Sequence, residues 1–271
     1  MAVSTDLRSC PEAARRVKPQ RALRRLRRQG STATAKERTL TLTTLGFDAD
    51  DTLWHNESFF RRTGEEILRL LEPWVPRGDL ALALLAAERR NIPLYGYGVK
   101  GFTLSMMETA ITLSDGRVPA QVLGEVMAAG RDLLAHPLEL LPQVRETLES
   151  LAGAHRLLLI TKGDLIHQER KLAASGLAGL FDGVEILSEK DSAAYARIFA
   201  RHGAAPRQAL MVGNSMKSDV LPALEAGAWG VFVPHGTPWE LEHAEAPEGH
   251  PRYREIASID RLPELICNLR L

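Results

Sequence analysis

Three aspartates that follow an apolar run near residue 47 carry the strongest chemical signal in the sequence. Residues 47–52 read Phe-Asp-Ala-Asp-Asp-Thr, so Asp48, Asp50 and Asp51 crowd into four positions. Carboxylates this close repel one another unless a cation lies among them. A hard divalent cation such as Mg²⁺, which prefers oxygen ligands, would meet that need. The alternative interpretation is an acidic turn that caps the helix after it.

Further polar groups follow other apolar runs. Thr161 closes one run and precedes Lys162 and Gly163, which together offer a hydroxyl and permissive backbone N–H groups to an oxyanion. Lys190 follows a second run and brings a fixed positive charge, and Asp219 lies one turn into the helix predicted after a third. Taken singly, these residues could be a helix cap, a surface lysine and a partner of the helix dipole. Their order along the chain favours one shared site.

The elements that must position these residues alternate along the chain. Short apolar runs predict strands over 39–47, 155–161, 184–188, 209–213 and 230–234. Amphipathic stretches of helical length lie between the later runs, over 141–151, 165–175, 192–202 and 216–226. This alternation predicts an α/β fold with a Rossmann-like parallel sheet covered on both faces.

A helical block interrupts this pattern after the first strand. Residues 58–136 contain helical windows at 59–71, 80–90, 102–113 and 119–135 and no convincing strand. We interpret this block as a cap domain inserted into an α/β core of residues 39–57 and 137–271. In such sheets the site lies at the carboxyl ends of the strands, so the cap would stand over it. A Gly-rich turn of the cap carries Lys100, which could meet a second anionic group of a substrate.

In their order, these residues resemble the four motifs of the haloacid dehalogenase (HAD) superfamily of hydrolases. Asp48-Ala-Asp50-Asp-Thr52 resembles the first motif, Thr161 the second, Lys190 the third, and Gly213-Asn214-Ser215 through Asp219 the fourth. The resemblance spans residue 39 to about residue 235, and the helical block has the position of the family's C1 caps. It implies a HAD-like core and phosphoryl transfer with Mg²⁺ as cofactor.

The resemblance also implies residue roles. Asp48 would be the nucleophile, forming an aspartyl-phosphate, and Asp50 the general acid and base. The metal would be held by Asp48, the Asp50 carbonyl and Asp219, with Asn214 nearby. The predicted phosphate and substrate contacts are Thr161, Lys190, Thr52, Lys162, Gly163 and Lys100. One departure stands out, because Asn214 occupies a position where the family commonly has an acid.

The function that follows is a Mg²⁺-dependent phosphatase acting on a small phosphorylated metabolite. Dehalogenases of the superfamily need no metal and lack the second aspartate of the first motif, so Asp50 and Asp219 favour a phosphatase. A phosphomutase needs the same residues and stays an alternative, as does a non-catalytic interaction protein that has retained the fold. Lys171 is an alternative to Lys190, which we prefer because Lys171 falls inside a helix with a predicted solvated face.

The net charge of zero over 271 residues averages two unlike parts. Residues 1–38 hold eleven bases and three acids, or +8, and the remainder carries −8. We predict that residues 1–38 are a disordered basic extension, with an organelle transit peptide or a nucleic-acid contact as alternatives. Cys10 and Cys267 suggest no disulfide framework, and no apolar stretch is long enough to span a membrane, so we expect a cytoplasmic protein.

Overall fold

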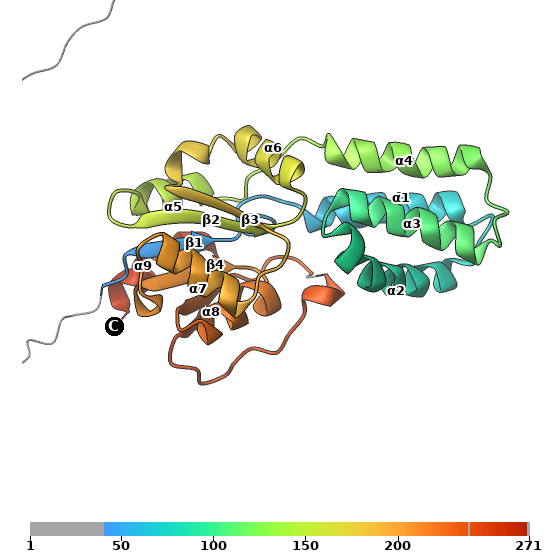
Figure 1. Ribbon diagram of the computed structural model, residues 1–271. Coiled ribbons are helices and arrows are strands. Elements are labelled where there is room, and N and C mark those ends of the chain that lie inside the picture. Colours follow the sequence, from blue (N-terminus) through green and yellow to red (C-terminus); the bar gives the residue numbers. More distant parts are fainter. Residues whose placement is uncertain (1–40, 238, 270–271) are drawn as a thin grey trace, which may run out of the picture. The chain divides into compact units, whose positions relative to one another are not determined.

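A parallel six-stranded sheet with helices on both faces forms the centre of the protein (Figure 1). The structure is a computed structural model and describes residues 41–237 and 239–269. The basic extension predicted for residues 1–38 lies outside the described residues. In the order β3-β2-β1-β4-β5-β6, the strands are Gly183–Leu187, Arg156–Lys162, Thr44–Phe47, Ala209–Gly213, Trp229–Phe232 and Tyr253–Glu255. The predicted α/β class with a Rossmann-like sheet is confirmed.

The register of the sheet brings the strand ends together. Phe47, the last residue of β1, pairs with Leu159 of β2 on one side and with Val212 of β4 on the other. Residues just beyond β1, β2 and β4 therefore emerge at the same edge of the sheet. This edge holds the polar residues that the sequence singled out.

The strands are apolar because both faces of the sheet are covered. Side chains alternate along β2, so that Leu157 and Leu159 belong to one hydrophobic cluster and Leu158 and Ile160 to the other. Helices α5 (Val144–Leu151), α6 (Leu165–Ser175) and α9 (Leu262–Asn268) contribute to the first cluster. Helices α7 (Ser192–Arg201) and α8 (Leu221–Glu225) contribute to the second.

Strand β6 and helix α9 were not among the elements predicted from the sequence. Tyr253–Glu255 is only three residues long and carries two charged side chains, so no apolar run marks it as a strand. Strand β6 lies at the edge of the sheet, where one side has no neighbouring strand, so it can form without an apolar run. The helix predicted over 216–226 is also different, because it begins as a π-helix over Met216–Val220 before α8.

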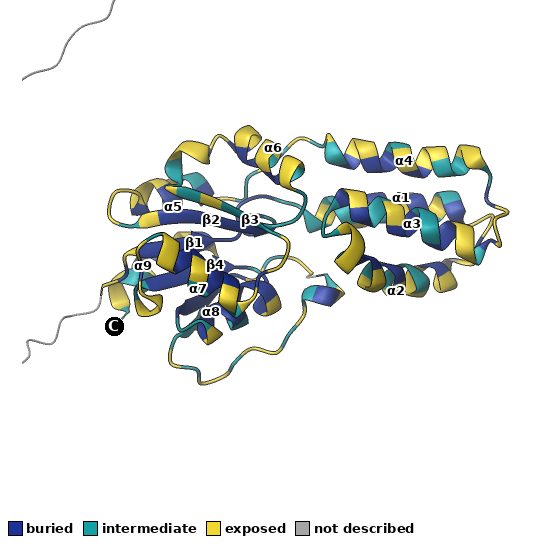
Figure 2. Ribbon diagram, in the orientation of Figure 1, coloured by how far each residue is buried: buried dark blue, intermediate teal, exposed yellow. Residues whose placement is uncertain are grey.

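The helical block forms its own hydrophobic core. It consists of α1 (Glu57–Leu71), α2 (Arg77–Tyr95), α3 (Val99–Leu113) and α4 (Ala120–Leu134). Ile67, Leu80, Met106 and Val126, one from each helix, lie buried in a common cluster, and Figure 2 shows the buried faces of these helices. We call residues 57–134 the helical segment. Helix α2 runs to Tyr95 through Pro93 and so extends beyond the helical window predicted over 80–90.

Two connections join the helical segment to the core, and they pair with each other. The His55 N–H donates to the Glu139 carbonyl (3.0 Å), and the Leu141 N–H donates to the Leu53 carbonyl (2.9 Å). Between these bonds Trp54 forms an antiparallel bridge with Leu140. The chain therefore leaves the core and returns to it at one place.

None of the helices within the described residues has both the length and the apolar character needed to traverse a lipid bilayer.

Candidate active site

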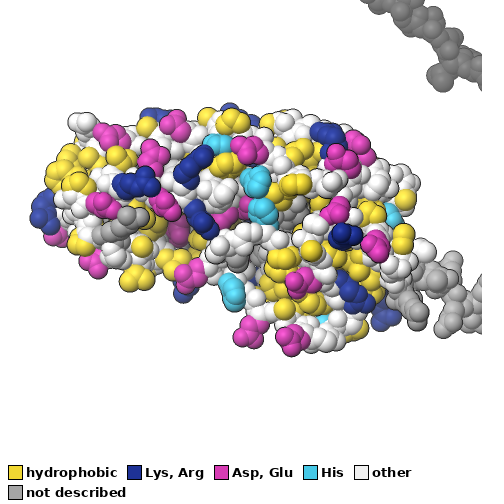
Figure 3. All heavy atoms as spheres, turned by 180° about the vertical axis from the view of Figure 1, so that it is seen from behind, with side chains coloured by type: hydrophobic (Ala, Val, Ile, Leu, Met, Phe, Trp, Pro, Cys, Tyr) yellow, Lys and Arg dark blue, Asp and Glu magenta, His cyan; other side chains and the backbone are white. Residues whose placement is uncertain are grey.

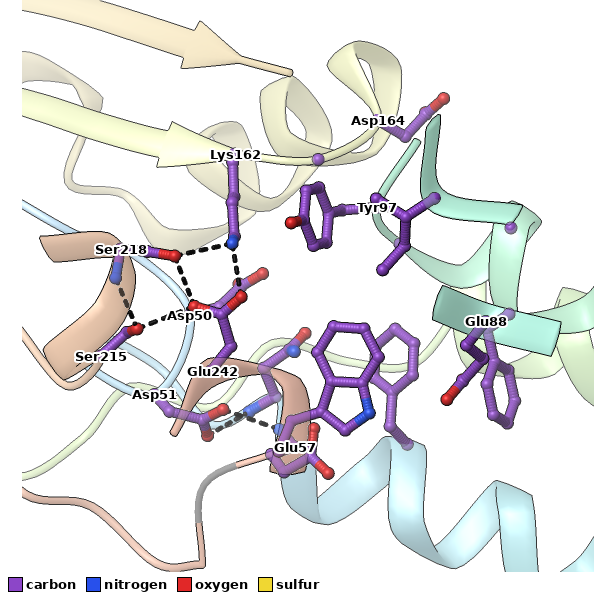
Figure 4. Close-up of a pocket in the computed structure, with 18 of the residues that line it drawn as sticks. Asp50, Asp51, Glu57, Glu88, Tyr97, Lys162, Asp164, Ser215, Ser218 and Glu242 are labelled. Carbon is purple, nitrogen blue, oxygen red and sulfur yellow. Dashed lines mark hydrogen bonds and ion pairs between the residues drawn. The ribbon is translucent and has the colours of Figure 1, made fainter. Parts of the chain in front are cut away.

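A cavity of about 390 Å³ lies between the carboxyl ends of the strands and the helical segment (Figure 4). Most of the residues predicted for the site line it: Asp48, Asp50, Thr161, Lys162, Gly163, Lys190, Asn214 and Asp219. They lie at the carboxyl ends of β1, β2, β3 and β4 or just after them, because parallel strands present their carboxyl ends at one edge. The helical segment contributes the opposite wall.

Lys190 joins two aspartates at the floor of the cavity. Its Nζ donates to Asp48 Oδ1 and, at 2.7 Å, to Asp219 Oδ1, and its side chain is 1% exposed. Burial, followed by the charge of Asp219, raises the pKa of Asp48 to about 7 despite this lysine. The site thus holds more negative charge than Lys190 neutralises.

Asp219 lines the same cavity as Asp48 and Asn214 and is paired with Lys190. Its Oδ2 accepts from the Ser215 N–H (2.9 Å), so both of its oxygens are engaged. A side chain on Gly213 would collide with it, since an added Cβ would lie 2.2 Å from Asp219 Oδ2. Lys190 thus bridges Asp219 and Asp48, and the role of Asp219 in holding a metal stays a prediction.

Asp50 is held by a set of donors. Lys171 Nζ (2.8 Å) and Trp54 Nε1 (2.6 Å) donate to its Oδ1, and Gln168 Nε2 donates to its Oδ2 (3.1 Å). Burial favours the neutral acid, but Lys171 and these hydrogen bonds outweigh it and lower the pKa of Asp50. Asp48 and Asp50 thus have pKa values shifted in opposite directions, a pattern typical of carboxyl groups with different tasks.

Gln168 and Lys171 contact Asp50, although the sequence analysis did not single out Gln168 and named Lys171 only as an alternative to Lys190. Both extend from α6, and Gln168 Nε2 also donates to Thr161 Oγ1 (2.8 Å). The solvated face predicted for Lys171 is wrong, because its Nζ reaches Asp50 and Asn56 Oδ1 (2.7 Å). Their spacing of three places both on one face of the helix with buried Leu172, a signal that could have located them.

The third aspartate of the cluster has a structural task. Asp51 accepts hydrogen bonds from the backbone N–H groups of Asn56 and Glu57, both at 2.9 Å, at the start of α1. This is the capping role weighed against a metal site. The capping interpretation therefore holds for Asp51, and a metal site at this place would depend on Asp48 and Asp50.

The atoms around Asn214 suit a hard cation. Its amide group lies 3.2 Å from Asp48 Oδ2 and 3.0 Å from the Asp50 carbonyl, to which it donates when its nitrogen faces them. If the amide oxygen of Asn214 faced the same way, it would form a set of three oxygen ligands with Asp48 Oδ2 and the Asp50 carbonyl. Mg²⁺ prefers oxygen ligands of this kind. No group of three or more His, Cys, Asp or Glu side chains in the described part of the chain is arranged to hold a metal. The Asp50 carbonyl and the Asn214 amide must then complete such a site.

Two residues predicted to contact the substrate, Thr52 and Lys100, are not among the described residues that line the cavity. Thr52 is buried, donates to Asp48 Oδ2 (3.3 Å) and accepts from the Asn214 N–H (3.1 Å), so it positions Asp48 from behind. Lys100 donates to Asp164 Oδ2 (2.8 Å), and its contact with a substrate anion stays a prediction. The Gly-rich turn points this lysine toward the start of α6.

Gly163 lines the cavity with its backbone N–H already engaged. That group donates to the Leu187 carbonyl (3.1 Å) and extends the pairing of β2 with β3. Its predicted role as an oxyanion donor is therefore not available in this conformation. The φ of +132° still requires glycine here, since side chains rarely adopt that region.

Two carboxyl groups of the helical segment face the cavity with altered acidity. Burial and the charge of Asp51 raise the pKa of Glu57 to about 7, and burial raises the pKa of Glu88 to about 7. Both therefore titrate near neutral pH. The wall opposite the strand ends gains negative charge as the pH rises.

Glu88→Gln is expected to stabilise the fold at pH 8 by on the order of 1 kcal/mol and to change nothing at pH 4. The Glu88 carboxyl favours folding below its unfolded pKa and loses that contribution as the pH rises through about 7. Urea unfolding at the two pH values measures the difference. Glu66→Gln, exposed on the same helical segment, is the control. An equal effect of Glu88→Gln at both pH values would contradict the prediction.

Comparison with known proteins gives a consistent result. A family model described as haloacid dehalogenase-like hydrolase matches residues 42–227. A glyceraldehyde 3-phosphate phosphatase of Methanothermobacter thermautotrophicus is 26% identical, with 81% of this chain and 96% of the relative covered. Pyrimidine 5′-nucleotidase YjjG of Escherichia coli is 28% identical, with 82% and 96% covered. A crystal structure of a haloacid dehalogenase-like hydrolase from Xanthomonas campestris is 38% identical, with 87% and 95% covered and a TM-score of 0.77.

Proposed function

The chain belongs to the haloacid dehalogenase-like hydrolase family, and from this premise we propose that it hydrolyses a small phosphomonoester. The observation that carries the proposal is the pair Asp48 and Asp50, which line one cavity at the carboxyl ends of the strands and are each paired with a lysine. Asp48 is paired with buried Lys190, which supplies a cation beside the reacting group. The phosphatases and nucleotidase among the relatives support this choice of reaction.

Asp48 is the proposed nucleophile. A carboxylate oxygen of Asp48 forms a bond to phosphorus as the bond from phosphorus to the ester oxygen breaks. Lys190 stays beside Asp48 and offsets the charge of the transferred group. Thr161 and the backbone of Lys162, at the end of β2, are proposed to contact the phosphoryl oxygens.

Asp50 is the proposed general acid and base. The lowered pKa of Asp50 leaves it ionised, so the monoanion of the phosphomonoester supplies the proton that Asp50 passes to the departing ester oxygen. Asp50 then takes a proton from the water that hydrolyses the aspartyl-phosphate. Lys171, Trp54 and Gln168 fix its orientation through the hydrogen bonds described above. This second carboxyl group distinguishes the proposal from the dehalogenase alternative, which needs no proton donor for the departing halide.

Mg²⁺ is the proposed cofactor, and Asp48, the Asp50 carbonyl and Asp219 would hold it, with Asn214 nearby. When bound, it supplies positive charge that lets an anionic phosphate approach a carboxylate. Asn214 contributes a neutral amide where the family commonly has an acid, so the negative charge of the proposed site comes from Asp48 and Asp219.

Removal of divalent metal with EDTA is expected to lower the hydrolysis of para-nitrophenyl phosphate by about 100-fold or more, since Mg²⁺ offsets several kcal/mol of repulsion. Added Mg²⁺ in excess should restore the rate. The thermal midpoint of the chelated protein, measured in parallel, controls for unfolding. Undiminished hydrolysis in EDTA would refute the metal requirement.

Release of inorganic phosphate separates the alternatives. A phosphatase releases one phosphate for each alcohol, whereas a phosphomutase returns the phosphoryl group to an organic acceptor. A dehalogenase would release halide from a 2-haloacid and no phosphate from an ester. A non-catalytic protein would do neither over a broad panel of phosphates and metals.

We propose a small phosphorylated metabolite as substrate and the cytoplasm as the location. The described part of the chain has one free cysteine, Cys267, which fits a reducing compartment. Basic and acidic side chains are interspersed over the face shown in Figure 3, so that face has no surface of one sign suited to a nucleic acid.

A further inference from the structure

A carboxylate of the chain itself occupies an anion-binding position inside the cavity. Lys162 Nζ donates to Glu242 Oε1 (2.6 Å), and the hydroxyls of Ser215 (2.7 Å) and Ser218 (2.5 Å) donate to Glu242 Oε2 (Figure 4). We call these four residues the Glu242 cluster. They come from three separate segments, namely the end of β2, the loop after β4 and the connection from β5 to β6.

The Glu242 carboxylate is ionised and firmly held. Burial works to raise its pKa, but Lys162 and the two hydroxyls outweigh burial and lower the pKa of Glu242. Its side chain is 13% exposed, and that of Lys162 is 14% exposed. Charge-assisted hydrogen bonds of this kind are the strong ones in proteins. Removing Glu242 from these donors would therefore be costly.

The segment that carries Glu242 also contacts the helical segment. Trp239 packs edge-on against Tyr97, with ring centroids 6.3 Å apart, and Lys162 Nζ lies 3.9 Å from the centre of the same tyrosine ring. Lys217 Nζ donates to the Leu241 carbonyl (2.7 Å) and fixes the segment from the core side. These contacts hold Glu242 at the cavity wall.

We propose that Glu242 is a specificity-determining residue that disfavours phosphomonoesters whose organic part carries a second anionic group. This inference rests on the phosphatase function proposed above and specifies its substrate class. A lysine and two hydroxyls beside the reacting groups would be a ready site for a carboxylate or a second phosphate. The Glu242 carboxylate saturates those donors and adds a negative charge at the same place.

The remaining wall supports the same substrate class. Of the described residues that the helical segment contributes to the cavity, Glu57, Glu65 and Glu88 are acidic and only Arg61 is basic. Apolar side chains cover much of the same wall: Phe60, Leu68, Leu84, Ile92 and Phe102. Lys100, the cation predicted to receive a second anion, is paired with Asp164. The organic part of the substrate is accordingly neutral or apolar.

Matched esters test the role of Glu242. Ethyl phosphate and phosphoglycolate differ only by a methyl group in place of a carboxylate, and propyl phosphate and 3-phosphooxypropionate repeat the comparison with a longer chain. The wild-type protein with Mg²⁺ should have the higher kcat/KM for the neutral ester of each pair. Glu242→Gln should raise the ratio of anionic to neutral kcat/KM by about tenfold or more in at least one pair, because it removes one charge at short range.

Two variants control for charge and folding. Glu242→Asp keeps the charge and should keep the wild-type preference, and Glu240→Gln removes an exposed carboxylate two residues away and should leave both rates unchanged. A wild-type preference for the anionic esters would overturn the proposal. An unchanged ratio in Glu242→Gln would do so as well.

Binding separates this inference from the phosphatase function. In the Asp48→Asn background, isothermal titration calorimetry with Mg²⁺ should show that the neutral ester of each pair binds more tightly than the anionic ester. Adding Glu242→Gln should reduce this difference in affinity between the two esters. Equal effects on both esters would overturn the role of Glu242. Absence of hydrolysis by wild type and by every single variant, with this binding preference intact, would instead overturn the phosphatase function alone.

Discussion

Asp48→Asn is expected to lower kcat for para-nitrophenyl phosphate by about 10⁴-fold or more, because the amide cannot form the bond to phosphorus. The fold should survive. Burial and Asp219 raise the pKa of Asp48 to about 7, so the folded protein already disfavours a charge at this position. Steady-state hydrolysis measures the first effect and urea unfolding the second.

Asp51→Asn is the matched comparison for Asp48→Asn. Asp51 lies three residues away and receives two backbone N–H groups of α1, so an amide with one oxygen should cost about 1 kcal/mol of unfolding free energy. Most of the activity should remain. Activity of Asp48→Asn above about one hundredth of the wild-type value would assign the nucleophile to another residue.

Lys190→Met is expected to destabilise the fold by about 3–5 kcal/mol and to abolish hydrolysis, because two buried carboxylates lose their shared cation. The side chains of Lys190 and Asp219 are each 1% exposed, so water cannot take over the role of the lysine. Urea unfolding at pH 7, without metal, measures the loss of stability. Lys171→Met should cost less, since Lys171 and Asp50 are both more exposed.

A second substitution distinguishes charge imbalance from lost packing. In Asp219→Asn/Lys190→Met one of the two stranded charges is gone, and we expect more than half of the lost stability to return. A double variant as unstable as Lys190→Met would show that the packing of the lysine chain, and not its charge, stabilises the floor of the cavity.

Local sequence was sufficient for the strand-end part of the site. Each buried strand is a short apolar run, so the polar residue that follows it marks the strand end, as Asp48 and Thr161 do. Parallel pairing then places those ends at one edge without any further information. The position of the helical segment follows in the same way, because its helices interrupt the alternation of strands and helices.

Some side-chain positions could not be predicted because they depend on which face of a helix is buried, or on contacts between residues far apart in the sequence. Lys171 was placed on a solvated face because charge alone does not reveal which face of α6 meets the loop after β1. Glu242 lies 80 residues from its partner Lys162 in a connection without regular periodicity, and no local pattern marks it. Asp219 was read correctly as part of the site, but only the position of Lys190 shows which way its carboxylate is turned.

The paired connections at His55 and Leu141 have a consequence for the evolution of such enzymes. Because the chain leaves and re-enters the core through two hydrogen-bonded neighbours, everything between them can be exchanged without moving either end. The nucleophile and its partners stay on the strands, while a different insert can present a different wall to the substrate. New substrate ranges can thus arise by recombination at a single junction, with the chemical machinery inherited intact.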